Sequence, residues 1–153
     1  MNEVVRKYWQ GFLDTNPEVP ADTPYQVWHF GNTKEMALDL AGLVFAGKKI
    51  GTASLAAVNK IKPDEAPIPA GYSVVTDLDD MPLCIIQTTE IRHIPFDEVD
   101  AQFAADEGEG DQSLEYWRDI HHRYFTREAA ELGLDFNERS IICCERFRLV
   151  FPQ

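Results

Sequence analysis

The stretch FAGKKIGTASL, Phe45–Leu55, joins an apolar segment to small and β-favouring residues through a glycine and two lysines. Gly47 can adopt the left-handed conformation that ends many helices, so we expect a helix to stop there. The residues that follow would enter a strand, in which alternate side chains point to opposite faces. The lysines and the hydroxyls of Thr52 and Ser54 would therefore lie where a helix gives way to a strand.

The helix that precedes this stretch is predicted from its first turn. Asn32 or Thr33 can accept a hydrogen bond from a free amide, and the charge of Glu35 suits the positive helix end. Apolar residues then recur at three- and four-residue intervals, which predicts a buried stripe. The stripe consists of Met36, Leu40, Leu43 and Val44.

The remaining elements mix helices and strands without a strict β-α-β alternation. The apolar periodicity predicts helices over 3–13, 95–108 and 113–133. Extended segments are predicted at 25–31, across a hairpin within 72–94, and at 139–151. This order favours an α+β fold, or a small barrel with flanking helices, over a doubly wound sheet.

The length of 153 residues, 44% of them hydrophobic, predicts one domain over 1–153, with a helix and loop at 1–24 packed on the barrel. The sequence holds no apolar run long enough for a membrane span, and its first residues are charged. We therefore expect a soluble, cytoplasmic protein that does not bind membranes. Cys84, Cys143 and Cys144 form no spaced metal pattern and are expected to be reduced core residues.

The formal charge of -12 limits the possible partners. An acid excess of this size repels phosphate backbones, so binding to duplex DNA is not expected. A local basic pocket could still hold one nucleotide or a short single strand. The acids gather between 97 and 119, where solvated faces are the ordinary explanation.

The stretch from Phe45 to Leu55 has two chemical interpretations, a phosphate-binding P-loop and a catalytic pair of side chains. GLVFAGK, 42–48, satisfies the first seven positions of a phosphate-binding P-loop, but Lys49 stands where magnesium needs a hydroxyl, and the segment ends a helix instead of following a strand. The alternative treats Lys49 and Thr52 as a catalytic pair, in which a lysine with little water around it takes a proton from a hydroxyl or from water. A simpler role also stays open, since lysines often neutralise the negative end of a helix.

Four segments together resemble the ASCH family, whose members adopt a PUA-like β-barrel and carry a Gly-x-Lys motif at the barrel mouth. They are GKKIGTASL, CIIQTTEIRHIPFDEVD, FAADEGEGDQSLEYWRDIHHRYF and IICCERFRLVF. Their order along residues 25–151 carries the resemblance, because any one short motif is weak evidence. The implied fold is α+β, a PUA-like barrel with flanking helices.

The resemblance implies work on RNA or nucleotides, as a binding module, a ribonuclease or an amidohydrolase that removes acyl groups from cytidine. In the amidohydrolases a lysine, a threonine three residues later and a glutamate on a following strand do the chemistry. Lys49 and Thr52 match the first two, whereas Gln87 stands where the carboxylate is expected. Glutamine can bind a substrate but cannot transfer a proton. Glu90 would face the opposite side of the strand from Gln87 unless a β-bulge intervenes.

The segment EGEGD, 107–111, suggests either a metal site or a turn between two helices. It lacks the length and the closing glutamate of a calcium loop, so a turn with its acids in water is expected, and no metal or other cofactor. His121 and His122 point about 100° apart on a helix and are poorly placed to share a metal. His121 is expected to line a wall near the barrel mouth or to pack in the core.

We therefore expect a barrel mouth that binds single-stranded RNA or a modified nucleoside or nucleotide. Lys49 and Thr52 would be catalytic if the protein is a metal-independent hydrolase, with Lys49 as base. The expected binding residues are Lys48, Ser54, Gln87, Trp28, Trp117, His121 and Tyr124, whose aromatic members could stack a base or fill the core. The alternative is a non-catalytic module that binds RNA or a protein.

Overall fold

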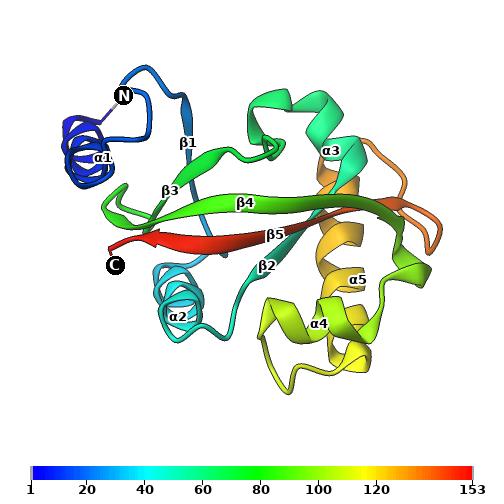
Figure 1. Ribbon diagram of the computed structural model, residues 1–153. Helices are drawn as coiled ribbons and strands as arrows, with labels where there is room; N and C mark the ends of the chain where they lie inside the picture. Colours follow the sequence, from blue (N-terminus) through cyan, green and yellow to red (C-terminus); the bar gives the residue numbers. More distant parts are fainter. Residues whose placement is uncertain (1, 153) are drawn as a thin grey trace.

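The computed structural model describes residues 2–152, and its helices and strands form a curled sheet with helices around it (Figure 1). The strands are β1 (Tyr25–His29), β2 (Gly51–Leu55), β3 (Tyr72–Thr76), β4 (Pro82–Pro95) and β5 (Ile141–Phe151). The α-helices are α1 (Glu3–Thr15), α2 (Lys34–Phe45), α3 (Ala56–Ile61), α4 (Ala101–Glu107) and α5 (Leu114–Glu131). Two 3-10 turns, η1 (Pro63–Glu65) and η2 (Phe96–Glu98), complete the order.

The sheet has the strand order β1-β3-β4-β5-β2. Strand β1 runs parallel to β3, and the other pairs are antiparallel. The hairpin predicted within 72–94 is therefore confirmed as β3 and β4. The two edge strands, β1 and β2, are not hydrogen-bonded to each other in the described chain, so the sheet forms a half-barrel that stays open between them.

Side chains on the two faces of the sheet pack against different helices. Val74 of β3 lies in a cluster with Trp9 and Phe12 of α1, whereas the next residue, Val75, packs with Phe30 and with residues of α2. This alternation is the period-two geometry of a strand that is buried on both faces. Helix α1 thus packs on the outer face, at the opposite end of the sheet from α4 and α5 (Figure 1).

Helices α2 and α5 begin and end close to where the sequence predicts. Thr33 caps α2 by accepting a hydrogen bond from the Met36 amide, and Ser113 caps α5 in the same way. The predicted stripe of α2 is wrong at Met36, which is 43% exposed. The short alanines Ala37 and Ala41 are buried in its place, because they allow α2 to approach the sheet closely.

The segment predicted as one helix over 95–108 is divided. Residues 96–98 form η2, and α4 begins only after Asp100, whose carboxylate accepts a hydrogen bond from the amide of Phe103. Because the Asp100 side chain satisfies a free amide of the first turn, it favours the start of α4 directly after residue 100. The predicted apolar residues Phe96 and Val99 are nevertheless buried. Helix α3 is an element that the sequence analysis did not predict.

Gly108 ends α4 and sets the course of the turn that follows. Its φ of +71° lies in the left-handed region, and a Cβ at this position would overlap the backbone carbonyl of Lys48. Glycine is needed here for two reasons, its backbone conformation and the close approach of the segment that carries Lys49. Gly133 has a similar φ of +69° but open space around it.

We predict that Gly108→Ala destabilises the fold far more than Gly133→Ala. The second substitution adds only the cost of a left-handed alanine, about 1 kcal/mol. The first adds a backbone clash, for a total of about 3 kcal/mol or more. Urea unfolding midpoints of both variants measure the difference, and equal losses of unfolding free energy would contradict the packing argument.

Candidate functional site

A cavity of about 920 Å³ opens between the two edge strands of the half-barrel. Residues 26–29 of β1 and the following Phe30 line one side, and Thr52, Ala53 and Ser54 of β2 line the other. Helices α2, α3 and α5, the η1 turn, β5 and the turn after α4 contribute further lining residues. The volume lies within the range of about 300–1,000 Å³ that small-molecule sites occupy.

Six of the nine predicted site residues line this cavity. They are Trp28, Lys49, Thr52, Ser54, His121 and Tyr124. Lys48 is exposed and Trp117 is 2% exposed, and neither lines the cavity. Gln87 also lies elsewhere: its side chain donates to the carbonyl of Ala70 and accepts hydrogen bonds from the guanidinium of Arg148.

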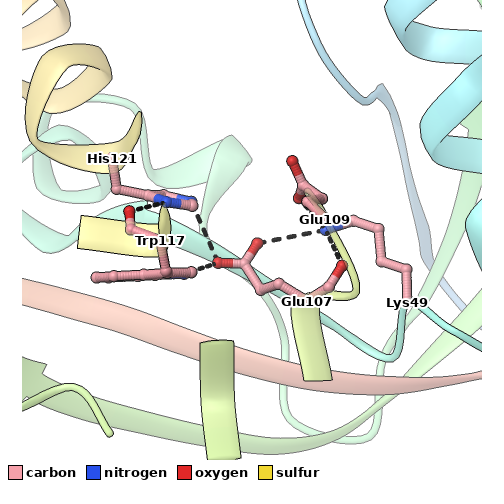
Figure 2. A network of polar contacts seen from close by, with 5 residues as sticks. All are labelled: Lys49, Glu107, Glu109, Trp117 and His121. Carbon is pink, nitrogen blue, oxygen red and sulfur yellow. Dashed lines mark hydrogen bonds and ion pairs between the residues drawn. The ribbon is translucent and has the colours of Figure 1, made fainter. Parts of the chain in front are cut away.

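Lys49 is buried, with 1% of its surface exposed, and its ammonium group is fully hydrogen-bonded (Figure 2). Nζ donates to Glu109 Oε2 at 2.7 Å, to Glu107 Oε1 at 3.3 Å and to the Glu107 carbonyl oxygen at 3.3 Å. The ring of Phe30 lies 5.3 Å away. An ammonium has three donors, so this arrangement uses all of them.

Two of the three carboxylates between 107 and 111, those of Glu107 and Glu109, are directed inward and are not solvated as expected, whereas Asp111 is exposed as expected. Glu107 is 2% exposed, and the side chain of Glu109 is 25% exposed. Asp111 accepts a hydrogen bond from the amide of Ser113 at the start of α5. The expectation fails because a buried lysine needs anionic partners, and this turn is the segment that reaches it.

Glu107 joins Lys49 to a second group of buried donors. Its Oε2 accepts hydrogen bonds from the indole N–H of Trp117 and from His121 Nε2, which lies 3.1 Å away. Burial opposes ionisation of Glu107, but Lys49, His121 and Trp117 together outweigh it and hold its pKa well below the usual value. Glu107 is therefore an anion in the folded protein.

A further buried carboxylate, that of Glu145, lies across from Thr52. Strand β5 places it directly opposite Thr52 in the antiparallel register, and it lines the same cavity. Its Oε2 accepts a hydrogen bond of 2.6 Å from the hydroxyl of Thr88. Burial raises the pKa of Glu145, although the Thr88 hydrogen bond and the charge of Lys49 act in the opposite direction.

The aromatic residues divide into core and cavity groups. Trp117 stacks on His121 with ring centroids 4.2 Å apart and is 2% exposed, so of the two roles left open for it, stacking a base or filling the core, the structure supports the core role. Trp28 is half-buried against Phe30, and Tyr124 is 43% exposed. These two rings remain available to a guest in the cavity.

Within residues 2–152, no group of three His, Cys, Asp or Glu side chains is placed to hold a metal ion. Over the same residues, no helix has the length and apolar character needed to cross a bilayer. The cysteines are all buried thiols without disulfides, as predicted.

Glu107, Glu109 and Glu145 are the site residues that the sequence analysis missed. Glu107 and Glu109 were considered only as possible metal ligands. Their alternation with Gly108 and Gly110 was the sequence feature that could have indicated a turn with inward-pointing carboxylates. Glu145 had no local signal, since it sits in a strand of apolar residues whose pairing with β2 is long-range.

Comparisons with known proteins agree with this architecture. The family model for the ASCH domain matches residues 26–151. The crystal structure of an ASCH domain from Lactobacillus crispatus is 31% identical, with a TM-score of 0.87 over 98% of this chain and 96% of that one. A protein from Enterococcus faecalis is 33% identical, with a TM-score of 0.85 over 99% of this chain and 92% of the other.

A more distant hypothetical protein shares the fold alone, at 12% identity and a TM-score of 0.56 over 82% of this chain and 99% of that one. No curated protein matches the chain. The half-barrel, the order of its elements and the family match confirm the predicted α+β, PUA-like fold. The chain belongs to the ASCH domain family.

Proposed function

We propose that the cavity binds an uncharged modified nucleoside and that the protein hydrolyses an amide on it, with acylated cytidine as the substrate class. The observation that carries this proposal is the gathering of Lys49, Thr52 and Glu109 on one partly enclosed cavity. The choice of cytidine as substrate rests on the resemblance to amidohydrolases of the family. The choice of hydrolysis as the reaction rests on the residues gathered in the cavity.

The charge of the cavity favours a nucleoside over a nucleotide or an RNA strand. Only Lys49, Arg123 and Arg127 bring positive charge that is independent of histidine. The acidic lining residues are Glu35, Asp39, Asp64, Glu65, Glu107, Glu109, Glu128 and Glu145. A site with such an excess of carboxylates repels phosphate groups, whereas a neutral sugar and base pay no such penalty.

The proposed chemistry divides acid and base roles between Lys49 and Glu109. Lys49 was the expected base, but its Nζ donates three hydrogen bonds and offers no lone pair to a proton. Lys49 would stabilise an oxyanion instead, through its charge and through a donor released when the substrate displaces one of the 3.3 Å contacts to Glu107. Glu109, partly exposed and held by a single ion pair, is the better proton acceptor. Thr52 supplies the hydroxyl that attacks the acyl carbon or that orients the attacking water.

The reaction is balanced by one water molecule. Glu109 takes a proton from the Thr52 hydroxyl or from water as the oxygen bonds to the acyl carbon, and Lys49 stabilises the negative oxygen that forms. The proton then passes to the exocyclic nitrogen as the carbon–nitrogen bond breaks. The products are the carboxylic acid and the free amine; if Thr52 attacks first, water releases the acyl group from the ester.

RNA binding without hydrolysis is the second candidate, and it rests on the family resemblance. Trp28 and Tyr124 could stack bases at the open side of the cavity. The carboxylate excess weighs against it, because a strand that enters the cavity brings its phosphates along. An interaction module that needs no cavity residue is the remaining alternative.

We predict that Thr52→Val and Glu109→Gln each lower kcat/KM for an acylated cytidine by about 100-fold or more, because each removes a group that acts on the reacting atoms. Thr52→Ser should retain most of the activity. Thr89→Val on the exposed part of β4 is the matched control, since Thr89 does not line the cavity. Product formation is followed by chromatography, and wild-type rates in both cavity variants would remove the proposal.

We also predict that the nucleoside form of the substrate binds more tightly than its 5′-monophosphate or a single-stranded RNA that carries the same base. The carboxylates of the cavity repel the added phosphate, so the preference should shrink as salt concentration rises. Calorimetric titration at two ionic strengths measures it. Tighter binding of RNA, weakened by salt, would instead support the RNA-binding candidate.

A further inference from the structure

Glu107 is the central anion of a buried hydrogen-bond network (Figure 2). On one side its Oε1 accepts from Lys49 Nζ at 3.3 Å. On the other side its Oε2 accepts from the indole N–H of Trp117 and from His121 Nε2. Helix α5 therefore supplies two donors that fix the orientation of the carboxylate to which Lys49 is bound.

Both ring nitrogens of His121 face oxygen acceptors. Nδ1 lies 2.8 Å from the carbonyl oxygen of Trp117, and Nε2 lies 3.1 Å from Glu107 Oε2. A backbone carbonyl cannot donate, so Nδ1 carries a proton. A neutral ring would then present the lone pair of Nε2 to the Glu107 carboxylate, and two lone pairs repel each other. The contact at Nε2 therefore needs a second proton.

The charges around His121 determine whether the second proton is held by its Nε2 or by the Glu107 carboxylate. Glu107 of α4 and Glu109 of the following turn are the acids that act on it, and Lys49 is the one cation in the same network. Within its own helix, His121 donates a hydrogen bond from Nδ1 to the Trp117 carbonyl oxygen, and the rings of Trp117 and Phe125 pack against the imidazole. Two carboxylates against one ammonium leave one negative charge, which an imidazolium balances.

We infer that His121 is a positioning residue, which holds Glu107 and through it Lys49 in place only while both of its ring nitrogens carry a proton. His121 contacts none of the reacting atoms in this role. The consequence for hydrolysis rests on the proposed function, whereas the charge state of the ring does not.

The dependence on pH has a definite sign. Burial disfavours the imidazolium, but the hydrogen bond and the charge of Glu107 outweigh it and raise the pKa of His121 above its ordinary 6.5. A group whose pKa is raised by folding stabilises the folded state fully below its unfolded value and loses that contribution as pH rises through the folded value. The contribution of His121 to the network is therefore complete below pH 6.5 and is lost as pH rises through the raised pKa of His121.

The test is an NMR titration of the histidine ring nitrogens in the complete wild-type chain, with His121→Asn used to assign the signals. We expect His121 to show two protonated nitrogens and a titration midpoint above 6.5. Glu107→Gln should move that midpoint downward, because the carboxylate charge is lost. A neutral His121 ring with a midpoint at or below 6.5 in wild type overturns the inference, whether or not the Glu107 variant folds.

The second arm follows hydrolysis as a function of pH. Wild-type kcat/KM should fall as pH rises through the His121 midpoint, and His121→Asn should be about tenfold slower below it and lack that decline. His122→Asn is the matched control, since His122 is exposed, bonds only to Glu138 and does not line the cavity. An unchanged profile in His121→Asn overturns the positioning role. A wild-type protein that hydrolyses nothing removes the proposed function but leaves the ring titration as a complete test of the charge state.

Discussion

Burying an ammonium group is costly unless several acceptors replace the water that it loses, and this requirement shapes the centre of the molecule. Lys49 is almost completely buried and finds its acceptors on the turn after α4, about sixty residues further along the chain. The turn can reach Lys49 only because Gly108 permits both a left-handed backbone and a close approach to Lys48. Removing either carboxylate partner would leave charge without compensation in a place that water reaches poorly.

The ion pairs of Lys49 with Glu107 and Glu109 lie beside a cavity because the half-barrel is open. If β1 and β2 were paired, the sheet would close and its interior would be filled by side chains, as in small barrels. The gap instead exposes Thr52 and one edge of Glu109 to a cavity whose aromatic wall comes from Trp28. Rigid strands on both sides and a capped helix behind the network favour a preorganised arrangement, which is what proton transfer and oxyanion stabilisation need.

The carboxylates that line the cavity are part of the acid excess of the whole protein. Its net charge of -12 extends into the cavity, where most titratable lining residues are carboxylates. Glu107 and Glu109 are engaged with Lys49, and Glu145 is buried against a hydroxyl. Negative charge in the cavity holds the cation of Lys49 in place, and in the proposed function it also disfavours ligands that carry phosphate.

Most of the local elements could be predicted from short stretches of sequence. Caps at Thr33 and Ser113, the helix stop at Gly47 and the hairpin signal around 77–82 depend on neighbouring residues, so their physics is contained in short windows. The same holds for the family resemblance, which depends on the order of such windows. Lys49 and Thr52 were found for this reason, since they stand three residues apart beside a helix end.

Only the tertiary structure decided which carboxylates meet Lys49. The sequence analysis looked for one on β4 and found Gln87, which the register pairs with Arg148 outside the cavity. Glu107 ends α4, and Glu109 lies in the turn that follows. Glu145, which lines the same cavity, comes from the last strand, where β5 lies beside β2. These contacts depend on the register between β2 and β5 and on the conformation of the turn at Gly108. Neither follows from local propensity, because contacts between distant segments depend on how the whole chain packs.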